Sequence, residues 1–196
     1  MAEQLTEGEK QTLLRLAREA MECAVRGQGL PPLEIQSLTP ILQENGASFV
    51  TLTIDSDLRG CIGALEAYQP LADDVREHAV AAALHDPRFP PVREIELNSI
   101  KLEVSRLTAP HLLEYSSSAD LLQKLNPHVD GVILKDSFRR ATFLPQVWEQ
   151  IPDPAEFLGH LCQKMGVRST LWQDAKLQVY IYQVEEFHET NDNRSA

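Results

Sequence analysis

Residues 49–63 have the sequence FVTLTIDSDLRGCIG, which predicts a β-hairpin. Apolar residues and threonines alternate from Val50 to Ile54, as expected for a strand with one buried face. The polar residues 55–57 follow as a turn, because Asp and Ser favour the backbone conformations of tight turns. A second strand is then predicted from Arg59 to Leu65. This hairpin also carries the candidate site, the hexapeptide LRGCIG at residues 58–63.

Two helices and a further strand are predicted around the hairpin. Residues 6–27 begin with the Thr-x-x-Glu spacing of a capping box and continue with apolar residues at helical spacing. An alanine-rich helix is predicted from Pro70 to His85, since proline suits the first turn of a helix. The proline-rich residues 86–91 end it. Apolar and polar residues alternate from 100 to 105, which predicts another strand with one face in water.

The same order of elements is predicted again in the second half of the chain. Its members are strands at residues 131–135 and 141–144, a helix at 154–165 and a strand at 176–184. We interpret residues 47–107 and 130–187 as an internal repeat. Aligning the two halves sets Arg140 on Arg59, and Thr142 falls on the cysteine of the hexapeptide.

The predicted fold class is α+β, with a largely antiparallel sheet, packed helices and two similar β-β-α-β halves. We expect the two hairpins to lie in one sheet, so that their arginines face a common groove. Residues 1–188 then form a single domain. Residues 189–196 are polar and unpatterned, which predicts a disordered tail.

Composition and charge exclude several classes of protein. The 196 residues are 43% hydrophobic and 24% charged, as in soluble globular proteins. The formal net charge of −11 repels phosphate backbones, so we predict no nucleic-acid binding. No apolar run is long enough to span a bilayer and no signal peptide is evident, which predicts a cytoplasmic protein without a membrane partner. Three distant cysteines fit a reducing compartment, and their spacing predicts no metal site.

The hexapeptide at residues 58–63 combines a cysteine and an arginine with two glycines on one strand. Glycine weakens a strand, so Gly60 and Gly63 predict the close approach of a ligand or of another backbone. Because side chains alternate between the two faces of a strand, Arg59 and Cys61 are expected to share a face. A nearby guanidinium would activate the thiol as a nucleophile or a metal-binding thiolate. We therefore identify Cys61 and Arg59 as candidate catalytic residues.

A purely structural role fits the same hexapeptide. The glycines would then serve a bulge or tight packing against the neighbouring helix, and Cys61 would be a small buried hydrophobic residue. If the thiol does react, a histidine is the expected base, and His85 is preferred because it leads into the proline-rich loop. The candidates are His78, His85, His111, His128 and His160.

The proline-rich loop DPRFPP at residues 86–91 supplies further candidate binding residues. Rigid loops with charged side chains frequently carry binding groups, which makes Asp86 and Arg88 candidates. A structural interpretation fits the loop equally well. In that case the Asp-Pro pair only stops the helix, Arg88 forms a salt bridge and Phe89 packs into the core. In the second half, Gln146 is a candidate ligand-binding residue; the alternative is a strand end beside Trp148 as a core aromatic residue.

Several of these segments resemble the AMMECR domain family, and the resemblance covers most of the chain. They are FVTL at 49–52, LRGCIG at 58–63, DPRFPP at 86–91, EVS at 103–105 with LT at 107–108, DGV at 130–132, LPQV at 144–147, FL at 157–158 and LC at 161–162. LRGCIG followed by DPRF at this spacing is highly specific. The chain departs from the family pattern at residues 137–141, where relatives usually carry more glycine.

The chain is similar to the bacterial branch called AmmeMemoRadiSam system protein A. The resemblance implies the fold and a context shared with a Memo-like protein and a radical S-adenosylmethionine protein, but no assigned reaction and no specified cofactor. We expect a small-molecule enzyme or substrate-binding subunit, in which arginines clamp a carboxylate or phosphate. The alternative is a non-catalytic adaptor for the two partner proteins. The expected cleft is lined by Arg59, Cys61, Asp86, Arg88 and Arg140.

Overall fold

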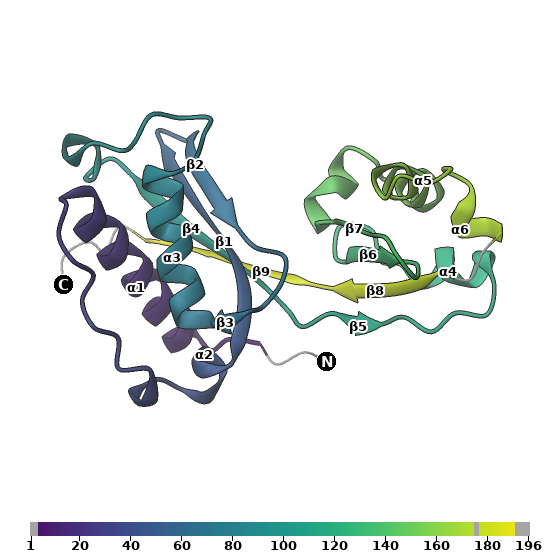
Figure 1. The fold of residues 1–196 in the computed structure, drawn as a ribbon, viewed down its shortest axis with the longest axis horizontal. Helices are drawn as coiled ribbons and strands as arrows, with labels where there is room; N and C mark the ends of the chain where they lie inside the picture. The colour runs from purple at the N-terminus through teal and green to yellow at the C-terminus, as the bar shows by residue number, and fades with distance from the viewer. Residues whose placement is uncertain (1–3, 175–176, 191–196) are drawn as a thin grey trace. The chain divides into compact units, whose positions relative to one another are not determined.

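A computed structural model describes residues 4–174 and 177–190 of the chain (Figure 1). Helices and antiparallel sheets confirm the predicted α+β fold class. The chain divides into two compact units: unit 1 comprises Met1–Leu107 and Glu185–Ala196, and unit 2 comprises Thr108–Val184. Among the described residues, no helix is both long and apolar enough to cross a membrane.

Unit 1 is a sheet with helices on one face (Figure 1). The strand order is β2-β1-β4-β9, and β3 pairs with β1. Its elements are α1 (Glu7–Val25), η1 (Ile35–Ser37), α2 (Pro40–Gln43), β1 (Asn45–Ile54), β2 (Asp57–Gly63), β3 (Gln69–Pro70), α3 (Leu71–Leu84), η2 (Glu94–Glu96), β4 (Lys101–Leu107) and β9 (Val184–His188).

The β1–β2 hairpin forms as predicted. Asp55 and Ser56 connect the strands with φ angles of 51° and 72°, which are the left-handed values that two-residue hairpin turns require. Val50 and Leu52 are fully buried on the face that packs against the helices. The register shifts between Leu52 and Thr53, so β2 contains one extra residue, a β-bulge, close to its start.

Helix α1 begins at the predicted capping box. The Thr6 hydroxyl accepts from the Glu9 backbone N–H at 3.4 Å, and the Glu9 carboxylate accepts from the Thr6 N–H at 2.7 Å. The apolar side of the helix places Leu13, Ala17 and Met21 in a core shared with α3 and the sheet. Burial of this side holds α1 on the sheet, because the helix has no other large apolar surface.

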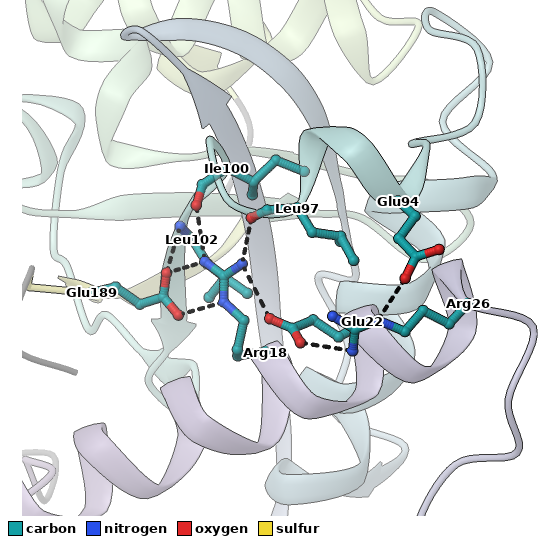
Figure 2. Close-up of polar contacts among 8 residues, drawn as sticks. All are labelled: Arg18, Glu22, Arg26, Glu94, Leu97, Ile100, Leu102 and Glu189. Atoms are coloured by element: carbon teal, nitrogen blue, oxygen red, sulfur yellow. Dashed lines mark hydrogen bonds and ion pairs between the residues drawn. The ribbon is translucent and has the colours of Figure 1, made fainter. Parts of the chain in front are cut away.

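Arg18 on α1 binds the chain just beyond β9 (Figure 2). Its Nε donates to Glu189 at 2.8 Å, and its Nη2 donates to the same carboxylate and to the Ile100 carbonyl at 2.9 Å. Nη1 donates to the Leu97 carbonyl at 3.3 Å. The Glu189 N–H in turn donates to the Leu102 carbonyl at 3.0 Å. One guanidinium therefore connects the helix, the loop before β4 and the end of β9.

The prediction that the disordered tail begins at Glu189 is wrong for this residue. Its side chain is only 6% exposed, and its carboxylate pairs with Arg18. A polar residue at the end of a chain usually lies in solvent, whereas a long-range ion pair satisfies the Glu189 carboxylate inside the protein. Residues 191–196 of the predicted tail lie outside the described residues.

We expect Arg18→Lys to lower the free energy of unfolding by about 2 kcal/mol, the size of a lost charged hydrogen bond. Lysine presents its donors from one point and cannot reproduce the planar fork that reaches Glu189 and two carbonyls. Urea denaturation measures the change. Arg15→Lys is the matched control, because the Arg15 side chain is 65% exposed and lies 3.7 Å from Glu19. Equal stability of the two variants would contradict this role of Arg18.

Unit 2 has its own sheet, with the strand order β5-β8-β6-β7. Its core contains Trp148 stacked on Phe157 at 3.6 Å, and the Trp148 indole N–H donates to the Asp130 carbonyl at 2.7 Å. Trp148 is thus a core aromatic residue. The elements are β5 (His111–Leu112), α4 (Ser118–Lys124), β6 (Gly131–Lys135), β7 (Arg140–Phe143), η3 (Pro145–Glu149), α5 (Pro154–Lys164), α6 (Leu171–Asp174) and β8 (Gln178–Tyr182).

The expectation of one continuous sheet is wrong, because each hairpin completes a sheet and a core within its own unit. In unit 1, β4 pairs with β1; in unit 2, β8 pairs with β6. Both sheets repeat one arrangement, in which the strand that follows the helix lies beside the first hairpin strand. The two similar β-β-α-β halves are therefore present, although residues 185–187 of the second predicted repeat belong to unit 1.

Candidate functional site

Cys61 lies on β2, at the edge of the unit 1 sheet. It stands opposite Thr51 in the β1–β2 register, whereas the neighbouring pair Val50 and Ile62 belongs to the helix-covered core. Side chains alternate between faces, so Cys61 points to the face opposite α1 and α3. Within the described residues of unit 1, no helix covers that face (Figure 1). Cys61 is half-buried, so the thiol is not sealed in the core.

The loop after α3 binds the outer edge of β2 at Cys61. The buried Asp86 carboxylate accepts from the Cys61 N–H at 2.8 Å, and Arg88 donates from Nη2 to the Cys61 carbonyl at 3.0 Å. Without these two hydrogen bonds, the Cys61 N–H and carbonyl would have no protein partner, because β2 is an edge strand. Asp86 and Arg88 therefore fix the backbone of the hexapeptide at its cysteine, as a neighbouring strand would.

Asp86 and Arg88 also bind each other tightly. Arg88 donates from Nε to Asp86 Oδ1 at 2.9 Å and from Nη2 to Oδ2 at 2.6 Å. The Arg88 guanidinium, helped by the Cys61 and Arg88 backbone N–H groups, holds the pKa of Asp86 far below its usual range despite burial. The aspartate is therefore an anion at neutral pH, and the expected salt bridge of Arg88 is present. The Arg88 side chain is nonetheless 53% exposed.

Thr51 contacts the Cys61 sulfur directly, with Oγ1 donating to Sγ at 3.3 Å. The backbone N–H and carbonyl of Cys61 bond outward to the loop, so Thr51 and Cys61 form a non-hydrogen-bonded antiparallel pair, in which side chains lie closest. Thr51 also stands directly opposite Glu103 of β4. The three side chains form a row across the sheet: Cys61, Thr51 and Glu103.

Glu103 is a site residue that was missed in the sequence. The pKa of Glu103 is raised, mainly by burial and to a smaller extent by the negative charge of Glu186. His188 acts in the opposite direction and lowers this pKa. The alternation of residues 100–105 places Glu103 on the polar face of its strand. The sequence does not show that this strand lies next but one to the strand of Cys61; only the strand order of the sheet does. His188 was not among the histidines considered, although it lies on β9 within electrostatic reach of the row.

Arg59 pairs with Glu96 of η2. Its Nε donates to Glu96 at 2.9 Å and its Nη2 at 3.3 Å, and this arginine lowers the pKa of Glu96 to about 2. The register shift leaves Arg59 without a directly opposite residue on β1, so the shared face of Arg59 and Cys61 stays a prediction. Its Nη1 is buried and has no hydrogen-bond partner among the described residues.

Protein atoms fill the room left by the two glycines. A Cβ at Gly60 would lie 2.1 Å from the carbonyl oxygen of Ala82 on α3, and one at Gly63 would lie 2.4 Å from the Phe49 ring. The close approach predicted at both positions is real, and its partners are α3 and β1; a role of Gly60 and Gly63 in binding a ligand stays a prediction. The two glycines therefore position the strand that carries Cys61.

Comparison with known proteins identifies the family. The AMMECR1 family model matches residues 14–187. The chain belongs to the AMMECR1 family. A protein of Methanothermobacter thermautotrophicus is 40% identical over 186 residues, which covers 94% of this chain and 96% of that protein. A protein of Methanococcus aeolicus is 36% identical over 194 residues, covering 97% and 96% respectively.

A solved structure shares the fold of this chain. The crystal structure of an uncharacterized protein from Pyrococcus horikoshii is 33% identical to this chain, with a TM-score of 0.75. The match covers 94% of this chain and 93% of that one, so it includes both units.

The remaining sequence-predicted residues of this AMMECR1-family chain lie in unit 2. Arg140 begins β7 and Gln146 lies on η3, and both are exposed. The cluster of Cys61, Asp86 and Arg88 is formed within unit 1. A pocket of about 400 Å³ also lies in unit 2, between α5 and residues 169–173, and none of the predicted catalytic or binding residues lines it.

The five histidines considered as a base lie in varied environments. His78 is buried and its Nδ1 lies 3.1 Å from a buried aspartate, whereas His85 is the exposed residue that ends α3. His111 is exposed on β5, His128 adopts a left-handed turn conformation, and His160 lines the pocket beside α5. The preferred role of His85 as the base for Cys61 remains a prediction.

Proposed function

We propose that this AMMECR1-family protein binds or converts a small anionic molecule at the Cys61 segment, with the thiol as the reacting group. The observation that carries the proposal is a pair of hydrogen bonds: the Cys61 N–H donates to Asp86, and Arg88 donates to the Cys61 carbonyl. They hold a half-buried thiol at a fixed place on the sheet edge, with an exposed guanidinium beside it. A fixed nucleophile next to a charged binding group favours reaction with a positioned substrate.

Arg88 is the proposed anion-binding group. Its Nε and Nη2 atoms are engaged by Asp86 and Cys61, while Nη1 has no hydrogen-bond partner among residues 4–174 and 177–190. A guanidinium presents five N–H donors in a rigid fork, so one edge can be held while another receives a carboxylate or phosphate. Arg59 is less suited, because its side chain is only 13% exposed, against 53% for Arg88. Arg140 and Gln146 stay predicted binding residues.

Selective alkylation tests the thiol. We expect iodoacetamide to modify Cys61 about tenfold faster than Cys162, because burial raises the pKa of the Cys162 thiol and slows its reaction. Cys61 is also expected to react faster than Cys23. Peptide mass spectrometry after timed quenching measures all three rates in one sample. An unreactive Cys61 would remove the proposed reacting group.

Anionic and neutral reagents test Arg88. Arg88→Gln is expected to lower the ratio of iodoacetate to iodoacetamide rates at Cys61 about fivefold, since unit charges 4 Å apart in water interact by about 1 kcal/mol. Arg88→Lys retains the charge and should restore most of the ratio. Arg15→Gln removes an exposed arginine from α1 and is the matched control. A ratio that is unchanged in Arg88→Gln would rule out anion binding by this residue.

An adaptor for Memo-like and radical S-adenosylmethionine proteins is the second candidate function. What favours it is the packing of Gly60 and Gly63 against protein atoms, which suits an architectural hexapeptide. In that case Cys61→Ser preserves function, whereas substitutions at exposed Arg88 abolish complex formation. Co-purification of the wild type and both variants with the two partner proteins separates the two functions.

A further inference from the structure

The row of Cys61, Thr51 and Glu103 places a thiol and a carboxyl group on one face of the unit 1 sheet. Thr51 stands opposite Cys61 on one side and opposite Glu103 on the other. Neighbouring strands lie about 4.8 Å apart, so the backbones of Cys61 on β2 and Glu103 on β4 are roughly 10 Å apart, with β1 between them. The residue between them has a short side chain. A small molecule lying over Thr51 can therefore contact both groups at once.

Charged groups on the neighbouring strands surround the Glu103 carboxyl. Glu186 and His188 act on it from β9, Cys61 lies across Thr51 on the other side, and Lys101 precedes it by two residues on β4. Burial and Glu186 raise the pKa of Glu103, against the effect of His188. This carboxyl group keeps its proton to higher pH than an ordinary surface glutamate does.

We propose that Glu103 is the general acid of the Cys61 site and that the row accepts a small molecule with an anionic group and an electrophilic carbonyl group. This inference rests on the proposed function, because it uses Cys61 as the nucleophile and Arg88 as the anion-binding residue. It adds a second catalytic residue and narrows the substrate class. Neither Asp86 nor Glu96 can take this role, since ion pairs hold both as anions.

The proposed step is the addition of the thiol to the carbonyl group. The Cys61 thiol releases its proton to water, and the sulfur forms a bond to the carbonyl carbon. The π bond of the carbonyl breaks, and its electron pair goes to the oxygen, which takes the proton of Glu103. The carboxylate regains a proton from water, so the product is a hemithioacetal or hemithioketal and no electrons enter or leave. Acid assistance of this kind contributes about 10²–10⁴-fold to a rate.

Glyoxylate is the probe, because it combines a carboxylate with an aldehyde. Exchange NMR with ¹³C-labelled glyoxylate measures the rate of adduct formation, and Cys61→Ser identifies the signal by its absence. We expect Glu103→Gln to lower this rate about tenfold or more, relative to iodoacetamide alkylation of the same thiol. Iodoacetamide needs no proton donor, so its rate corrects for any change in the thiol itself. Glu149→Gln removes an exposed carboxyl group of unit 2 and is the matched control.

The pH profile distinguishes an acid from a structural residue. The glyoxylate rate divided by the iodoacetamide rate should fall as pH rises through the pKa of Glu103, and Glu103→Gln should abolish that fall. Glu186→Gln leaves the burial of Glu103 in place but removes the second cause of its raised pKa, so it should move the fall to lower pH. A flat wild-type profile, or an undiminished rate in Glu103→Gln, overturns the inference while the proposed function stands. Failure of iodoacetamide to modify Cys61 would instead overturn both.

Discussion

Replacing Gly60 with alanine is expected to lower the free energy of unfolding by about 3 kcal/mol, the upper range for overpacking a close-packed core. The new Cβ would lie 2.1 Å from the Ala82 carbonyl oxygen and 3.1 Å from its carbonyl carbon. Both are backbone atoms in the last turn of α3, so they cannot turn aside as a side chain would. β2 must therefore move away from α3, and Cys61 moves with it. Urea denaturation measures the loss of stability.

Gly8 supplies the control for this substitution. It lies in the first turn of α1, and a Cβ there meets nothing within 4 Å. Gly8→Ala should raise the free energy of unfolding by about 0.5–1 kcal/mol, because alanine is the better helix former. Alkylation of Cys61 should slow in Gly60→Ala alone. Near wild-type stability of Gly60→Ala would show that β2 and α3 do not pack this closely.

Asp86→Ala should cost about 3 kcal/mol of unfolding free energy, as expected for a buried charged group with several hydrogen bonds. It removes the acceptor of the Cys61 N–H and both contacts to the Arg88 guanidinium. Cys61 should also lose its selective alkylation, because nothing then fixes its backbone at the sheet edge. Asp86→Asn keeps an acceptor oxygen without the charge and should fall between the wild type and Asp86→Ala.

The effect of Asp86→Ala should depend on pH. The folded-state pKa of Asp86 is lower than the unfolded-state value, so the carboxylate stabilises the protein above the unfolded pKa. That contribution is lost as pH falls through the folded pKa. The stability difference between the wild type and Asp86→Ala is therefore full at neutral pH and shrinks in acid. A difference that grows on acidification would contradict the assignment of Asp86 as an anion.

The fold could be predicted where its causes are local. The capping box at Thr6, the turn at residues 55–56 and the alternation along β1 each act over a few residues, and all three are present. The number of sheets depends on which distant strands pair, and periodicity does not encode that choice. The same limit explains Glu189, whose ion pair with Arg18 joins residues 171 positions apart.

The site was predictable in part for the same reason. Cys61, Asp86 and Arg88 stood out as unusual residues in rigid segments, and the structure brings them together. The extra residue in β2 beside Arg59 could not be predicted from alternation, because a bulge depends on how the two strands pair. Glu103 looked like an ordinary exposed strand residue. Its relation to Cys61 exists only once β1 lies between β2 and β4.

Unit 2 is inserted into unit 1 between β4 and β9, which gives the two units an order of completion during translation. The ribosome adds residues 185–190 only after all of unit 2 has been made. Until then β4 has an open edge, and the guanidinium of Arg18 lacks its carboxylate. A nascent chain can therefore finish the inserted unit first, while the unit whose synthesis began earlier waits for its last strand.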